Sequence, residues 1–308
     1  MCSTCDTSYD SELLKISFLK KHPSYLPYIG TEYRQSELKI LHVGNCHYIE
    51  PSQDPDGKFR YTFFKENWFN RKIDPLPEIY DLERQMSGSN KTLEWKKNNL
   101  TCENAWNNYC LNTRNVVAEM LLAQRNEYNL VGACKYGIFT GMIKVLSSTV
   151  GHFLYEDKKD KDIVKIRKPK TIKETEEYKE KVSIYNHIAF TDFHMFPALD
   201  RSDGYVDSRL IEAAEAENVI NAKEDAEQFY NDVIVKESSK VLDEIIKIIN
   251  PDVIFITSTK AGEIFRSNTS LEDEHKKRIY CARHPNSIYG PLDDYKNDFR
   301  DFINQLTI

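Results

Sequence analysis

Four short apolar runs, set apart by long stretches of helical or polar character, dominate the hydrophobic pattern of the chain. They read KILHV at 39–43, HIAFT at 187–191, DVIFIT at 252–257 and RIYCA at 278–282. Each run is a few residues long, rich in β-branched side chains and almost continuously apolar, which is typical of strands buried on both faces of a parallel sheet. The pattern therefore predicts four strands at these positions.

Helical periodicity fills the intervals between these runs. Apolar side chains recur at helical spacing within 94–149, and a stretch rich in Ala, Glu and Lys at 209–249 continues until Pro251. A last helix is expected at about 293–306. Because crossovers of a dozen or more residues join parallel strands, this order predicts an α/β fold. The expected architecture is a three-layer α/β/α arrangement around a central, mostly parallel four-stranded sheet.

The length of the chain suits one large α/β domain, and we expect residues 1–308 to form a single unit. Residues 10–29 predict a short helix that prolines end, so residues 1–36 form an expected N-terminal helical extension. Residues 155–180 are dense in Lys, Glu and Asp and are expected to be an exposed, charged insertion.

Charge and composition narrow the possible partners and the expected location. The formal net charge is −6, whereas a dedicated nucleic-acid-binding protein is usually basic, so tight non-specific DNA binding is disfavoured. The sequence has no run of about 18 apolar residues, so no membrane-spanning helix is expected. The N-terminal stretch lacks the basic and apolar regions of a secretory signal, so a cytoplasmic location is expected. Seven irregularly spaced cysteines predict reduced thiols rather than a disulfide framework.

The candidate chemistry lies directly after the four predicted strands. These segments read GNCHY at 44–48, DFHMFP at 192–197, STKAG at 258–262 and RHPNS at 283–287, and three of them carry a histidine. Ligands of open parallel sheets bind beyond the carboxyl ends of the strands. Neutral polar groups, imidazoles and aromatic faces suit a flat, polar, uncharged ligand such as a nucleobase. A base inside a duplex has to be flipped out before it reaches such a site.

The order of these segments resembles that of the uracil-DNA glycosylase superfamily. The family's first motif, GQDPY after a strand, is matched by VGNCHY, and its last motif, HPSP after a strand, by YCARHPNS. Between them, IAFTDF and VIFITSTKAGEIF stand where the family has two further strand ends. The likeness spans roughly residues 38–290 in short islands. It implies a uracil-DNA glycosylase-like fold and hydrolysis of an N-glycosidic bond that releases a base from DNA.

The resemblance also assigns roles to individual residues. His284 would stabilise the base as it leaves with negative charge, and Asn45 or Asp192 would place the attacking water. Tyr48 would form a wall of the site. The expected substrate-binding residues are Gly44, Cys46, His47, Tyr48, Phe63, Phe64, His194, Asn286 and Ser287.

Departures from the family motifs lead to two further hypotheses. Cys46 stands at the place of the catalytic aspartate, Asp192 at that of the asparagine that reads the uracil edge, and Ser287 at that of the second proline. The second hypothesis is therefore a nucleobase- or nucleic-acid-binding module that kept the fold and lost catalysis. The third is an unrelated α/β hydrolase that uses Cys46 with His47 or His194.

One branch of the superfamily carries an iron–sulfur cluster, held by an N-terminal CxxC and two later cysteines. Cys2 and Cys5 form a CxxC here, and Cys102 and Cys110 are the candidates for the later pair. Their separation is shorter than in that branch, and we expect neither a cluster nor another metal or cofactor.

Overall fold

The structure is a computed structural model. It describes residues 5–45, 113–114, 117, 142–143, 145–146, 148–150, 183–195, 211–212, 215–216, 218, 220–283 and 292–306.

A mixed sheet forms the centre of the molecule, and the described residues contribute five strands in the order β1-β3-β2-β4-β5. The strands are β1 (Tyr28–Ile29), β2 (Ile40–Gly44), β3 (Ala189–Asp192), β4 (Val253–Ile256) and β5 (Ile279–Cys281). β2, β3, β4 and β5 pair in parallel. All four strands that the apolar runs predict are confirmed, to within two residues at each end, and so is the α/β class.

The predicted count of four strands is wrong, because β1 adds a fifth. It pairs antiparallel with β3, with Tyr28 opposite Phe190 and Ile29 opposite Ala189. A two-residue strand is too short to show a period in the sequence, and this one lies among prolines and aromatic residues. A Cβ on the following Gly30 would collide with the main chain at Asn186, so glycine is what permits β1 to close the edge of the sheet.

The N-terminal stretch is more broken than the single short helix expected within residues 10–29. Its helical pieces are α1 (Asp10–Leu13), α2 (Ser17–Lys21) and the 3₁₀-helices η1 (Pro23–Tyr25) and η2 (Tyr33–Gln35). Pro23 stands in the first turn of η1, where its missing N–H costs no hydrogen bond. This stretch therefore supplies helical turns together with a strand of the central sheet.

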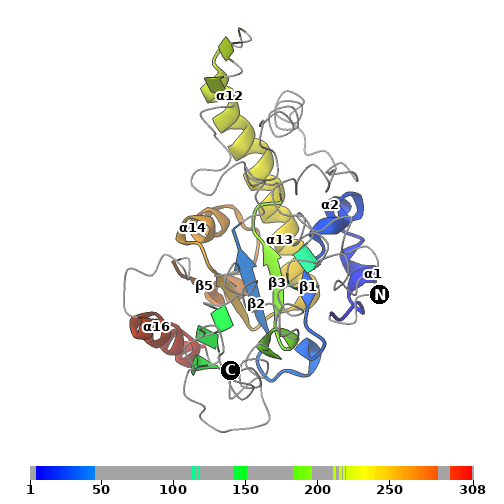
Figure 1. Cartoon of the computed structure of the whole chain (residues 1–308), viewed down its shortest axis with the longest axis vertical. Helices are drawn as coiled ribbons and strands as arrows, with labels where there is room; N and C mark the ends of the chain where they lie inside the picture. Colours follow the sequence, from blue (N-terminus) through cyan, green and yellow to red (C-terminus); the bar gives the residue numbers. More distant parts are fainter. Residues whose placement is uncertain are drawn as a thin grey trace, which may run out of the picture.

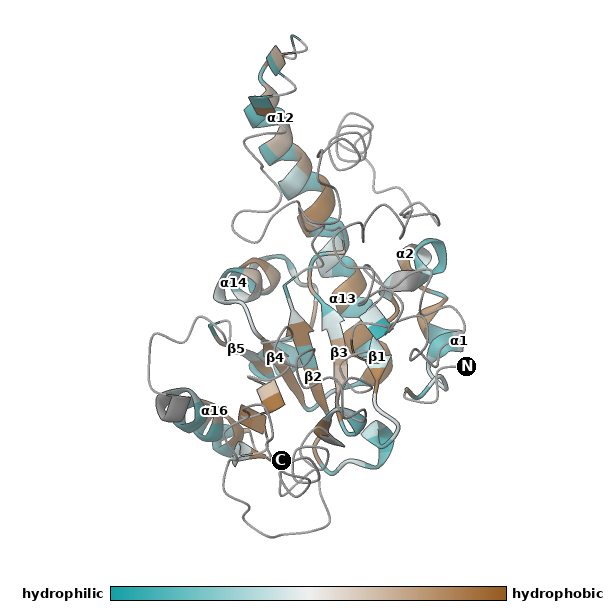
Figure 2. Ribbon diagram, in the orientation of Figure 1, coloured by the Kyte–Doolittle hydropathy of each residue, from teal (hydrophilic) through white to brown (hydrophobic). Residues whose placement is uncertain are grey.

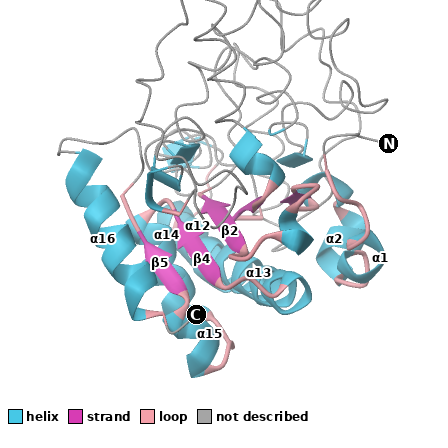
Figure 3. Cartoon of the chain, turned by 90° about the horizontal axis from the view of Figure 1, so that it is seen from below, coloured by secondary structure: helices cyan, strands magenta, loops and turns pink. Residues whose placement is uncertain are grey.

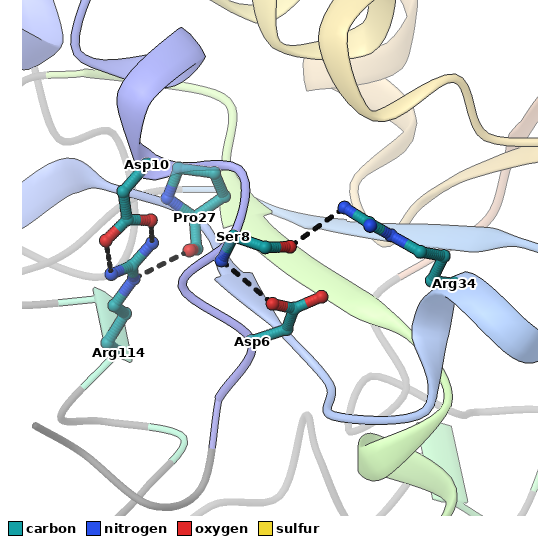
Figure 4. A network of polar contacts seen from close by, with 6 residues as sticks. All are labelled: Asp6, Ser8, Asp10, Pro27, Arg34 and Arg114. Carbon is teal, nitrogen blue, oxygen red and sulfur yellow. Dashed lines mark hydrogen bonds and ion pairs between the residues drawn. The ribbon is translucent and has the colours of Figure 1, made fainter.

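A partly buried ion pair ties this stretch to a helical segment further along the chain (Figure 4). The guanidinium of Arg114 contacts both carboxylate oxygens of Asp10, at 2.5 and 2.9 Å, and its Nε donates to the Pro27 carbonyl at 2.9 Å. Nearby, Arg34 donates to the Ser8 hydroxyl at 2.9 Å. Bidentate, partly buried pairing of this kind fixes geometry more strongly than an exposed ion pair does.

Among the described residues, the longest helical stretch runs through α12 (Ala222–Phe229), the π-helix η6 (Tyr230–Val235) and α13 (Lys236–Ile249). It lies within the helix predicted at 209–249 and stops just before Pro251, as expected. Figure 1 shows α12 projecting past the carboxyl ends of the strands, while α13 packs beside the sheet. Further elements in the described part of the chain are the 3₁₀-helix η5 (Ser183–Asn186), α14 (Thr259–Asn268), α15 (Asp273–Lys277) and α16 (Leu292–Gln305).

Helices cover both faces of the sheet, as the alternation along the strands requires. On one face Leu41 and Ile254 pack in a cluster with Leu242 of α13 and Phe265 of α14. On the other face Phe255 packs with Phe299 of α16, together with helical residues at 142–150. Figure 3 shows α16 and α13 on opposite sides of the strands, and Figure 2 shows hydrophobic residues along the central strands.

Burial of these side chains is what stabilises the architecture, at about 1.5–3 kcal/mol for each fully buried Val, Leu, Ile or Phe. Among the helices that the structure describes, none combines the length and the apolar composition that a membrane span needs.

Candidate functional site at the carboxyl edge of the sheet

The strand order singles out one point on the sheet. β2 and β4 are neighbours, but the chain leaves β2 to reach β3 on one side and leaves β4 to reach β5 on the other. Ligands of open α/β sheets bind at the carboxyl ends of the strands where such a reversal occurs. The residues that end β2 and follow β4 at this point are Gly44, Asn45, Thr257 and Ser258.

A carboxylate lies across the end of β2. Asp192 is opposite Gly44 in the parallel register of β2 and β3, and only 6% of its surface is exposed. A Cβ at Gly44 would collide with Oδ1 of Asp192 and would come within 3.3 Å of the Phe190 ring. Glycine at this position is therefore what allows the carboxylate to approach the main chain of β2 so closely.

A buried polar network lies on the same face of β2, one strand period before Gly44. Nδ1 of His42 is 3.1 Å from the hydroxyl of Tyr185, and its Nε2 is 3.2 Å from Oγ1 of Thr257. Thr257 donates its single hydroxyl hydrogen to the carbonyl of Val43 at 3.1 Å. Since that hydrogen is used, Nε2 of His42 must be the donor to Thr257.

Sequence reasoning missed this network. His42 is the polar residue of β2, Thr257 directly follows the apolar strand β4, and Tyr185 lies in η5, just before β3. All three side chains are fully buried. The available signal was His42 itself, because an imidazole inside a run such as KILHV has to find polar partners when it is buried.

His194 links the ends of β2 and β3 to the long helix. Its Nδ1 is 3.1 Å from the carbonyl of Asn45, and its Nε2 is 3.0 Å from the hydroxyl of Tyr230 in η6. Burial lowers the pKa of His194 to about 4, and the charge of Lys260 lowers it too, while the hydrogen bond to Asn45 acts in the opposite direction. The ring is therefore neutral at physiological pH.

The segment after β4 begins a helix. Ser258 caps α14 by accepting a hydrogen bond from the main-chain N–H of Ala261 at 3.2 Å. A Cβ on Gly262 would collide with Sγ of Cys281, so this glycine lets the first turn of α14 pack closely against β5. In the described contacts, Ser258 and Gly262 thus begin a helix and pack it against the sheet.

The structure brings four of the sequence-predicted site residues to one edge: Gly44, Asn45, Asp192 and His194. The remaining predicted site residues lie outside the described residues: Cys46, His47, Tyr48, Phe63, Phe64, His284, Asn286 and Ser287. The charged segment 155–180 lies outside them as well.

The described contacts bear on two hypotheses that involve cysteines: a hydrolase that uses Cys46 with a histidine, and an iron–sulfur cluster. Both ring nitrogens of His194 are engaged, with Asn45 and with Tyr230, so this arrangement does not present the imidazole as a base for a thiol. Of the candidate cluster ligands Cys2, Cys5, Cys102 and Cys110, the structure describes Cys5, whose thiol is buried and has a pKa that burial raises.

Comparisons of the chain with protein-family models, with curated proteins and with solved structures found no match.

Proposed function

We propose that the chain binds a nucleobase at the carboxyl edge between β2 and β4 and hydrolyses the N-glycosidic bond that joins this base to a sugar of DNA. The observation that carries the proposal is the placement of Asp192. Its buried carboxylate lies over Gly44, the residue before Asn45, at the point of the sheet where ligands of such folds bind.

Asp192 supplies, from the neighbouring strand, the carboxylate that the GNCHY loop lacks. Adjacent strands are about 4.8 Å apart, and the register places Asp192 directly opposite Gly44. A carboxylate carried by β3 therefore reaches the end of β2, close to the start of the loop in which the resembled family has its aspartate. The loss of that aspartate at Cys46 is compensated in this way.

In the proposed reaction a water molecule attacks the anomeric carbon while the bond to the base nitrogen breaks. Asp192 accepts a proton from the water, and the amide side chain of Asn45 orients it. The electron pair of the broken bond leaves with the base as an anion. The resemblance assigns stabilisation of that anion to His284, through an interaction of the oxyanion-hole kind.

The test is release of the base from single- and double-stranded oligonucleotides that carry uracil or other deaminated bases. We expect release by the wild type and a loss of about 10²–10⁴-fold in rate for Asp192→Asn, because the amide cannot accept the proton. Asp252→Asn is the matched control. Asp252 accepts from the main-chain N–H of Lys39 at 2.8 Å, before the start of β4 and at the opposite end of the strands.

Two results would contradict the proposal. Equal rates for the wild type and Asp192→Asn would remove Asp192 from the reaction. Absence of release from every substrate by a folded wild type would remove hydrolysis, and binding of free bases, measured by titration calorimetry, would then identify the chain as a binding module.

A further inference from the structure

A directed chain of hydrogen bonds joins the long helix to the main chain at the end of β2. The carbonyl of Asn45 can only accept, so Nδ1 of His194 carries the hydrogen in the 3.1 Å contact between them. Because the buried ring is neutral, Nε2 has a lone pair and accepts from the Tyr230 hydroxyl at 3.0 Å. The order of donation is therefore Tyr230 to His194 to Asn45.

The Asn45 carbonyl is held twice by the same residue. It accepts the main-chain N–H of His194 at 2.9 Å in addition to Nδ1–H. His194 itself is held in place, because 3% of its surface is exposed and the Phe193 ring lies 4.6 Å away, centroid to centroid. Two donors on one carbonyl restrict the orientation of the peptide plane at the end of β2.

The first donor in this chain of hydrogen bonds, Tyr230, lies at an irregular point of the long helix. Tyr230 is the first residue of the π-helix η6, and π-helical turns are rare and occur often at functional sites. Ile234 and Val235 of the same turn are buried, so η6 is anchored while Tyr230 reaches the sheet edge. Beyond it, α12 extends past the carboxyl ends of the strands (Figure 1).

We propose that Tyr230 and His194 are positioning residues of the site, which hold the main chain at Asn45 and thereby restrict where the Asn45 side chain can lie at the end of β2. They also couple the helical stretch at η6 to the main chain at the end of β2. The effect on catalysis rests on the proposed function, whereas the effect on the main chain at Asn45 does not.

Three variants separate the contributions of the two residues. Tyr230→Phe removes the hydroxyl and keeps the ring. His194→Phe removes both ring nitrogens, whereas His194→Asn restores an amide N–H near the place of Nδ1 and can still donate to Asn45. Tyr33→Phe is the matched control, because the Tyr33 hydroxyl donates to the Ile249 carbonyl at 3.3 Å, at the far end of α13.

The first readout is steady-state base release. We expect Tyr230→Phe and His194→Phe to lower kcat about 10–100-fold with little change in KM, since a displaced catalytic group slows the chemical step. His194→Asn recovers part of the loss, and Tyr33→Phe keeps the wild-type kcat. Unchanged kcat in both Tyr230→Phe and His194→Phe would overturn the proposal.

The second readout does not depend on activity. Nitrogen NMR of the His194 ring is expected to show hydrogen on Nδ1 and none on Nε2, and hydrogen exchange is expected to accelerate in peptides spanning Asn45 in His194→Phe, with no acceleration in Tyr33→Phe. A ring protonated on Nε2, or exchange unchanged in His194→Phe, contradicts the proposal. If both results appear as expected but the wild type releases no base, the positioning role stands and the proposed hydrolysis fails.

Discussion

At the residue scale, Gly44 decides how closely Asp192 approaches the end of β2. The carboxylate occupies the space that a side chain at position 44 would need, with the Phe190 ring beside it. The position of the buried Asp192 carboxylate thus depends on the absence of a Cβ at Gly44. Substitution of either residue tests whether this arrangement exists in solution.

We expect Gly44→Ala to lower the free energy of unfolding by about 1–3 kcal/mol, because an added methyl group in a packed site forces its neighbours to shift. In an Asp192→Ala background the same change is expected to cost less, since the colliding oxygen is gone. Urea unfolding of the two single variants and the double variant gives the coupling energy, which we expect to be about 0.5–3 kcal/mol. Strict additivity would show that the two residues do not touch.

At the element scale, the end of α13 depends on one residue of unusual backbone conformation. Asn250 adopts φ 44° and ψ 67°, and its N–H donates to the Ile246 carbonyl at 2.8 Å. The left-handed region is accessible to glycine and tolerated by asparagine, but it is costly for other L-residues. Asn250 therefore turns the chain out of α13 and into β4.

We expect Asn250→Ala to lower the free energy of unfolding by roughly 1–2 kcal/mol, because alanine meets the steric penalty of the left-handed region. Asn250→Gly is expected to stay within about 0.5 kcal/mol of the wild type, since glycine adopts this conformation readily. Thermal and urea unfolding measure both. Equal losses for the two variants would point to the Asn250 side chain, rather than its backbone conformation, as the source of the effect.

At the scale of the whole molecule, His194 makes stability depend on pH. Its pKa is about 4 in the folded protein and about 6.5 in an unfolded chain. Between these values the unfolded chain binds a proton that the folded protein does not, so the stability is present above about pH 6.5 and is lost as the pH falls towards 4. Burial also lowers the pKa of His187, which contributes in the same direction.

The expected loss from His194 alone is about 3 kcal/mol over this range, at about 1.4 kcal/mol per pH unit. Carboxylates also titrate towards the acid end, so the contribution of His194 is the difference in pH dependence between the wild type and His194→Asn. Urea unfolding at several pH values between 7 and 4 measures it. Parallel curves for the two proteins would show that His194 has an ordinary pKa in the folded state.

Much of the sheet was predictable because burial on both faces leaves a local signature. The runs around Ile40, Ala189, Val253 and Ile279 are mostly apolar, and each became a parallel strand. β1 was missed because two residues show no period. Its strand character comes from the unpaired edge of β3, which lies about 160 residues away along the chain.

The candidate site, like the sheet, was predictable in part from the sequence. The sequence by itself determined the α/β class, four of the strands and the expectation that polar residues gather after them, because hydrophobic periodicity and the parallel crossover rule act locally. Only the tertiary structure decided which of these residues meet. His42 finds partners 143 and 215 residues away, and strand register alone places Asp192 over Gly44. Such pairings follow from strand order and from the need of buried polar groups for partners. Neither can be predicted from the spacing of the residues along the chain.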